Sequence, residues 1–312
     1  MLRQILLYLS NEPQVARFVR HNPVAKRFAD RFVAGESLEQ VLDVVATLNE
    51  KGITASLDLL GESVHSEDEA RAAGREYLHL LDRIHERRLD ANVSVKLTAM
   101  GLDISEELCV TVVHEVLARA RDYRTFVRLD MESSAYTERT LRLFYERFYP
   151  AYPEHVGIVL QSYLHRTESD VGRAIDARAR VRLCKGAYKE PASVAFPAKS
   201  DVDANYVRCL RRLMREGHYP GIATHDERLL SDAKQFAAAE GIDTTRYEFQ
   251  MLYGVRRDLQ SALVRQGYRV RVYVPFGTQW YPYLMRRLAE RPANVFFIAG
   301  SVLREALRRR RA

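Results

Sequence analysis

Eight short apolar runs, rich in β-branched residues, recur along the chain, and segments of helical periodicity separate them. The runs are Ile53–Leu60, Asn92–Thr98, Phe126–Met131, Val156–Ser162, Arg180–Gly186, Gly221–His225, Tyr247–Leu252 and Arg269–Phe276. The helical segments include Ser37–Lys51, Glu67–Arg88, Glu106–Asp122, Glu138–Tyr149 and Leu229–Glu240. Strands that alternate with helices form βα units around a parallel sheet. Eight such units predict an α/β fold, a (βα)8 barrel, whose usual length of about 250 residues they match.

The main alternative is a doubly wound open sheet. That fold carries a glycine-rich phosphate loop after its first strand. The segment LLGESVHS, which follows the first run, has a single glycine, and neither G-x-G-x-x-G nor a Walker loop occurs. The barrel is therefore favoured. Because no linker of Pro, Gly and Ser divides the chain, we expect one catalytic domain, with extra helices over residues 1–52 and the barrel over residues 53–312.

Composition and charge narrow the function classes. No apolar run reaches the ~20 residues of a membrane span, and Glu12 and Pro13 interrupt the apolar N-terminus before a cleavage site, so a secretory signal is not expected. The three cysteines form no C-x-x-C pair, which disfavours a disulfide framework or a zinc site. We therefore expect a cytoplasmic protein.

The net charge of +7 raises the question of a nucleic-acid partner. Four of the excess positive charges are the terminal run Arg308–Arg311. Elsewhere the sequence lacks a basic stripe with interleaved aromatics, so no nucleic acid is expected as partner. The terminal run is either a solvated helix end or a contact for anionic lipid or a partner protein.

Polar side chains gather where the expected strands end. They are Glu62, Lys96, Asp130, Gln161, Arg182, Lys185, His225, Gln250 and Tyr273. The carboxyl ends of the strands carry the active site of a (βα)8 barrel. Any one of these groups could be a paired interior residue, but buried charge is costly without a partner or ligand. The group predicts a polar pocket for a large polar cofactor and a small charged substrate.

Several chemistries remain open on the residues alone. Adjacent Arg286 and Arg287 could bind a carboxylate in bidentate fashion, or could line a solvated helix face with Glu290 as partner. Histidines and carboxylates lack metal-ligand spacing, so no metal is expected. A Schiff-base lysine, Lys96 or Lys185, would make the protein an aldolase or lyase instead.

Long motifs then connect the chain to a known family. They are SLDLLGE, VKLT, RLDME, GIVLQSYL, RLCKGAYKEP, ATHD, YEFQMLYG and YVPFGTQWYPYLMRRLAE. From about Phe32 to Glu290 the chain resembles the proline dehydrogenase family in its monofunctional bacterial form. The resemblance implies a distorted (βα)8 barrel with FAD at the carboxyl ends of the strands and the eighth helix over the active site.

The resemblance also implies the reaction. L-proline would be oxidised to Δ1-pyrroline-5-carboxylate by hydride transfer from C5 to flavin N5, the first step of proline degradation to glutamate. Electrons would pass to a membrane quinone, so a peripheral position at the inner face of the cell membrane is expected. A transient contact with Δ1-pyrroline-5-carboxylate dehydrogenase is a further expectation.

Substrate contacts are implied for Lys96, Leu252, Tyr273, Arg286, Arg287 and Glu62. Arg286, Arg287 and Lys96 would clamp the proline carboxylate. Glu62 would pair with Arg286 as a lid contact. Tyr273 would pack beside the pyrrolidine ring and disfavour a hydroxylated ring, and Leu252 would form an apolar wall.

The remaining implied roles concern catalysis and FAD. The catalytic group would be Asp130, Arg182, Lys96 and Tyr273. Asp130 would hold the substrate-binding cations, and Arg182 would be the cation nearest the redox-active ring. The flavin would lie among Met131, Gln161, Arg182, Lys185, Gly186, Ala187, Tyr188, Thr224 and His225.

Overall fold

The structure is a computed structural model, and it describes residues 29–61 and 64–290, the last five of these by their backbone alone. The expected helices within residues 1–28, the lid residue Glu62 and the Arg308–Arg311 run lie outside the described residues. The side chains of Arg286 and Arg287 lie outside them too.

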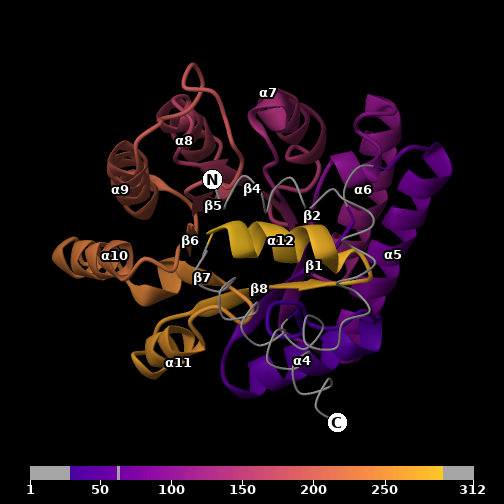
Figure 1. Cartoon of the computed structure of the whole chain (residues 1–312), viewed down its shortest axis with the longest axis horizontal. Coiled ribbons are helices and arrows are strands. Elements are labelled where there is room, and N and C mark those ends of the chain that lie inside the picture. Colours follow the sequence, from indigo (N-terminus) through magenta and orange to yellow (C-terminus); the bar gives the residue numbers. More distant parts are fainter. Residues whose placement is uncertain (1–28, 62–63, 291–312) are drawn as a thin grey trace, which may run out of the picture.

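Eight parallel strands close into a barrel in chain order, with β1 pairing with both β2 and β8 (Figure 1). The strands are β1 (Thr54–Leu59), β2 (Ala91–Val95), β3 (Val127–Leu129), β4 (Val156–Gln161), β5 (Arg180–Cys184), β6 (Gly221–Ala223), β7 (Glu248–Leu252) and β8 (Val270–Phe276). Each strand lies within one of the eight apolar runs or overlaps it closely. The predicted barrel is confirmed.

Helices surround the barrel. They are α4 (Leu38–Glu50), α5 (Glu67–Glu86), α6 (Glu106–Asp122), α7 (Ser134–Leu143), α8 (Thr167–Asp176), α9 (Lys199–Glu216), α10 (Glu227–Ala239), α11 (Arg257–Arg265) and α12 (Trp280–Glu290). Ser37, Ser66 and Ser105 cap α4, α5 and α6, each accepting from a backbone N–H of the first turn. Within the described residues, every helix is too short or too polar to pass through a lipid bilayer.

The helix expected over Glu138–Tyr149 begins earlier and changes geometry. It starts at Ser134 as α7 and continues as a π-helical turn over Phe144–Phe148. The N-cap Ser133 makes no side-chain capping bond; instead Oε1 of Glu190, from the loop after β5, accepts from the Ser134 N–H at 2.8 Å. A carboxylate distant in sequence thus stabilises this N-terminus, so the local sequence could not reveal where the helix begins.

The two faces of the strands differ sharply in polarity. Side chains alternate along a strand, and the outward set, including Leu57, Val93, Leu129 and Val272, is fully buried in the apolar core against the helices. The inward set is mostly polar and consists of Ser56, Asp58, Ser94, Arg128, Arg182, Glu248, Gln250, Arg271 and Tyr273, beside smaller or apolar residues such as Gly157, Val159 and Gly221. Arg182 on β5 bonds Ser56 on β1, across the closed barrel. Charged groups therefore fill the interior that leads to the carboxyl ends.

Helix α12 lies across the carboxyl end of the barrel, in front of the strands in Figure 1, and its Tyr283 lines the cavity there. The segment before α4 holds the start of this helix. Ala34 N donates to Pro275 O at 2.8 Å, and the Trp280 indole Nε1 donates to Oε1 of Glu36 at 3.0 Å. The expectation that the eighth helix covers this end is thus confirmed for the backbone.

Candidate active site

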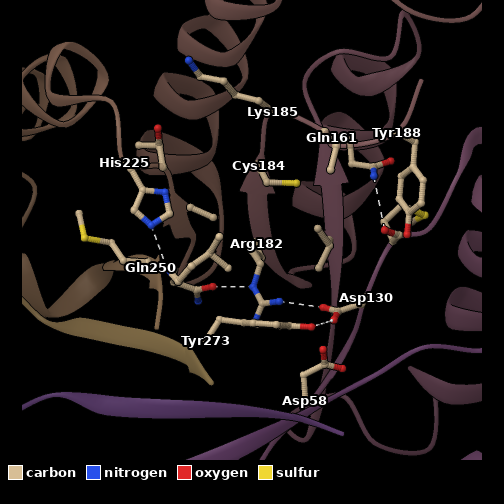
Figure 2. A pocket seen from close by; sticks show the side chains of 18 of the residues that line it. Asp58, Asp130, Gln161, Arg182, Cys184, Lys185, Tyr188, His225, Gln250 and Tyr273 are labelled. Atoms are coloured by element: carbon tan, nitrogen blue, oxygen red, sulfur yellow. Dashed lines mark hydrogen bonds and ion pairs between the residues drawn. The ribbon is translucent and has the colours of Figure 1, made fainter. Parts of the chain in front are cut away.

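A cavity of about 650 Å³ opens at the carboxyl ends of the strands (Figure 2). Its lining includes each residue that sequence analysis assigned to FAD: Met131, Gln161, Arg182, Lys185, Gly186, Ala187, Tyr188, Thr224 and His225. It also includes Lys96, Asp130, Leu252 and Tyr273, which were assigned to substrate or catalysis. Residues that are far apart in the chain therefore meet in one pocket.

Arg182 is the centre of the hydrogen-bond network on the pocket floor, and it is 7% exposed. Its Nε donates to Oε1 of Gln250 at 2.5 Å, and its Nη1 donates to Oδ1 of Asp130 at 2.8 Å. Its Nη2 donates to the hydroxyls of Ser56 at 3.3 Å and Ser94 at 3.2 Å. Four of the five guanidinium N–H bonds thus have acceptors among the described residues, which fixes the plane of a permanent positive charge.

Tyr273 and Asp130 complete this network. The Tyr273 hydroxyl donates to Oδ2 of Asp130 at 2.6 Å, and the Arg182 guanidinium lies over the Tyr273 ring, 5.1 Å from its centroid (Figure 2). Burial and the neighbouring carboxylate of Asp130 raise the pKa of the Tyr273 phenol well above its usual value. The phenol therefore stays protonated and donates throughout the physiological range.

The partner of Lys96 is a residue that sequence analysis missed. Asp58, at 2% exposure, accepts from Nζ of Lys96 at 2.6 Å. Asp130, which was expected to hold the substrate-binding cations, binds Arg182 and Tyr273 through its two oxygens. Burial lowers the pKa of Lys96, yet Asp58 and Asp130 outweigh burial and raise it above its ordinary value. A charged Lys96 can attract a carboxylate but is a poor nucleophile.

Lys185 is also held by acidic groups. Its Nζ lies 2.6 Å from Oδ1 of Asp203 and 3.0 Å from Oδ2 of Asp226. Schiff-base chemistry requires a free amine, whereas the Nζ of each candidate lysine lies within ion-pair distance of a buried or half-buried carboxylate. The geometry of both candidate lysines therefore disfavours the aldolase or lyase alternative.

The upper wall of the pocket contains a buried amide whose acceptor atom lacks a partner among the described residues. Gln161 Nε2 donates to the carbonyls of Met131 at 3.4 Å and Glu132 at 3.3 Å, whereas its Oε1 is buried without a hydrogen bond. A buried polar atom without a partner is costly. Because Gln161 lines the cavity, a ligand with an N–H donor would satisfy it.

Backbone geometry shapes the rest of this wall. Gly186 has φ +107°, and a Cβ there would lie 2.3 Å from the Tyr163 ring, so only glycine fits. Beyond it, Nε2 of His225 accepts from the Leu252 N–H at 2.9 Å. This bond joins the loop after β6 to the end of β7, and it positions one residue assigned to FAD beside one assigned to the substrate.

These features fit a large polar cofactor. The volume lies within the range of about 300–1,000 Å³ typical of small-molecule sites. The lining combines a fixed cation, an unpaired buried amide oxygen and a backbone wall without a side chain at Gly186. No group of three or more His, Cys, Asp or Glu side chains able to hold a metal is found in residues 29–61 and 64–290.

The closed barrel and the charged pocket at its carboxyl ends define the class of the protein, a (βα)8-barrel enzyme. The family model described as proline dehydrogenase matches residues 41–299. The proline dehydrogenase of Deinococcus radiodurans is 41% identical over 307 residues, which cover 97% of this chain and 98% of that protein. Proline dehydrogenase 1 of Bacillus subtilis is 40% identical, with 98% and 100% covered. The chain belongs to the proline dehydrogenase family.

Solved structures agree with this assignment. Proline utilization A from Bdellovibrio bacteriovorus, inactivated by N-propargylglycine, superposes with a TM-score of 0.81 at 27% sequence identity. The match covers 93% of this chain and 35% of that longer protein. The present barrel thus corresponds to one part of a larger protein in that case and to the whole protein in the Deinococcus and Bacillus relatives.

Proposed function

We propose that this enzyme oxidises L-proline to Δ1-pyrroline-5-carboxylate with FAD as cofactor, the first step in the degradation of proline to glutamate. The observation that carries the proposal is the convergence of the family-assigned residues on one pocket around Arg182. When bound, FAD would supply the oxidising chemistry, with its N5 as the acceptor of the hydride that leaves C5 of the proline ring, and a membrane quinone would take up the electrons.

The chain would bind the substrate by its charge and its ring. Lys96, fixed by Asp58, would attract the proline carboxylate together with Arg286 and Arg287. Orientation of a bound substrate contributes strongly to rate. Glu62 would pair with Arg286 and exclude water when the site closes.

The ring of proline would lie between Tyr273 and Leu252, both of which line the cavity. The Tyr273 hydroxyl, directed at Asp130, would leave no room for a substituent on the pyrrolidine ring. Nearby cations would also favour the neutral amine of proline over its ammonium form. The neutral amine is the form whose lone pair assists loss of the hydride.

The cofactor would be held along the opposite wall. Arg182 would place its positive charge near the redox-active ring and stabilise the reduced, more anionic form. Gln161 would accept from a ring N–H through its buried oxygen. The other contacts would come from Met131, Lys185, Gly186, Ala187, Tyr188, Thr224 and His225.

A membrane acceptor implies a cytoplasmic enzyme that visits the inner face of the cell membrane. We propose that the Arg308–Arg311 run contacts anionic lipid there. The product would pass to Δ1-pyrroline-5-carboxylate dehydrogenase in a transient contact. Vesicle flotation at low salt tests the lipid contact, and equal binding by a chain without these four arginines would refute it.

The visible spectrum of the purified protein tests the reaction itself. We expect a two-band flavin spectrum that bleaches when L-proline is added without oxygen. Bound flavin that L-proline leaves oxidised would move the substrate to another amine, with hydroxyproline tested first. Protein that fails to bind FAD, but that borohydride links to a substrate, would favour the lyase.

A further inference from the structure

A polar chain runs from Arg182 through Gln250, which also lines the pocket, into the barrel. Nε of Arg182 donates to Oε1 of Gln250, and Nε2 of Gln250 donates to Oε1 of Glu248 at 2.6 Å. The same carboxylate accepts from Nε of Arg271 at 2.8 Å, and Nη1 of Arg271 donates to the carbonyl of Ala55 at 2.8 Å. Gln250 and Glu248 are 5% and 4% exposed. The chain therefore links the pocket cation to a buried ion pair.

Gln250 is chemically specific in this place. A guanidinium only donates and an ionised carboxylate only accepts, so a group between them must accept at one end and donate at the other. An amide does this, whereas a carboxylate would repel Glu248 and an ammonium would repel Arg182. The two partners fix which end of the Gln250 amide faces the pocket.

The neighbouring strand makes room for this amide. Gly221 on β6 pairs with Arg182 on β5 and with Glu248 on β7. A Cβ at Gly221 would lie 2.4 Å from Nε2 and 2.8 Å from Cδ of Gln250. Since Gly221 has no positive φ, the need for glycine at this position is one of space.

We propose that Gln250 is a positioning residue: held by Glu248 and seated over Gly221, it sets the rotation of the Arg182 guanidinium that faces the cofactor ring. This inference rests on the proposed function, in which Arg182 stabilises reduced flavin. Without the bond at Nε, one of the four hydrogen bonds that hold the guanidinium is lost, and the group can shift about its Cδ–Nε bond within the limits set by Asp130, Ser56 and Ser94. Its charge then meets the ring at a less favourable angle, although it remains in the pocket.

Three variants of the FAD-loaded enzyme test the proposal. Gln250→Leu removes the amide, and Gly221→Ala displaces it without removing any polar group. Asn49→Leu is the matched control, because Asn49 Nδ2 donates to Ile53 O at 2.9 Å and its Oδ1 accepts from Asp90 N at 2.8 Å, at the amino end of the barrel. The measurements are the midpoint potential of the bound flavin without substrate, kcat and KM for L-proline, and urea unfolding.

We expect Gln250→Leu and Gly221→Ala to lower the flavin midpoint potential. The loss of one hydrogen bond to a charged group also predicts a kcat lower by roughly tenfold to a hundredfold, with KM changed less than about threefold. Asn49→Leu should lose stability to urea while keeping the potential and kcat of the unmodified enzyme. A loss of stability without a change in potential is the signature of a merely structural role.

The proposal is overturned if Gln250→Leu and Gly221→Ala keep the potential and kcat of the unmodified enzyme. If Gln250→Leu fails to fold, Gly221→Ala decides, because the three atoms nearest to its added methyl all belong to the end of the Gln250 side chain. If L-proline does not reduce the flavin of the unmodified enzyme, the proposed function fails. The flavin midpoint potentials of the variants then still test whether Gln250 positions Arg182. If no FAD binds, crystal structures of Gly221→Ala and the unmodified protein decide, and an unmoved Arg182 guanidinium refutes the proposal.

Discussion

The hydroxyl of Tyr273 donates to Oδ2 of Asp130 at 2.6 Å, and Tyr273→Phe removes this bond while keeping the ring beneath Arg182. A hydrogen bond to a charged group contributes about 1.5–3 kcal/mol. In the variant, Oδ1 of Asp130 still accepts a hydrogen bond from Arg182. Asp130 also borders the cavity, so a water molecule can replace part of the lost hydrogen bond. We therefore expect the free energy of unfolding to fall by about 1–2 kcal/mol.

Urea unfolding of the FAD-free protein, followed by far-ultraviolet circular dichroism, measures this loss. Tyr247→Phe is the control, because the Tyr247 hydroxyl is buried and lacks a hydrogen-bond partner among the described residues. Its removal should change the free energy of unfolding by less than about 0.5 kcal/mol, or should stabilise the protein. The reasoning fails if Tyr273→Phe is as stable as the unmodified protein, or if both variants lose the same amount.

Three further predictions concern specificity, cofactor binding and pH. Tyr273→Ser should relax discrimination against 4-hydroxyproline, and an unchanged ratio of kcat/KM values for the two substrates would contradict this. Gly186→Ala should weaken FAD binding at least tenfold, because the added methyl would clash with the Tyr163 ring and the backbone φ of +107° disfavours a side chain. Quenching of flavin fluorescence measures the affinity, and an unaltered affinity would refute the strain argument. Burial opposes ionisation of Glu248, but Arg271 outweighs it and lowers the pKa of Glu248 below its ordinary 4.5. The unmodified protein should therefore exceed Glu248→Gln in stability by the full amount above about pH 4.5, and this difference should shrink as pH falls through the lowered pKa of Glu248. The measurement is the urea midpoint of both proteins between about pH 7 and pH 3. A difference between the two midpoints that stays constant over this range would contradict the prediction.

The alternation of apolar runs and helical segments was enough to predict the barrel. Each strand buries its outward face under a helix, so its β-branched residues are visible in the sequence as a run. The start of α7 was not predictable in this way, because Glu190 reaches it from another loop. The local sequence pattern therefore predicted which strands and helices exist, whereas a tertiary contact determines where α7 begins.

The candidate site was predicted unevenly for a related reason. Polar residues at the strand ends stood out against apolar neighbours, and the described members of that group line the cavity. Asp58 was overlooked because it lies inside the first apolar run, and only the register that pairs Asp58 with Ser94 on β2 brings it to Lys96. Gln250 was noted, but its role depends on Arg182 and Gly221 on two other strands and on Glu248 on its own strand. The roles assigned to the residues of the cavity remain predictions, as do the assignments to Glu62, Arg286 and Arg287.

The opposite polarity of the two strand faces has a consequence for how the protein can change during evolution. Outward residues such as Leu57 and Val93 carry the packing against the helices, so their replacement should cost stability and leave the chemistry alone. Inward residues such as Gln161, Arg182 and Gln250 border the pocket and are not part of that apolar core. New substrate preferences can therefore arise on the inward face while the outward face, under separate selection, keeps the barrel closed.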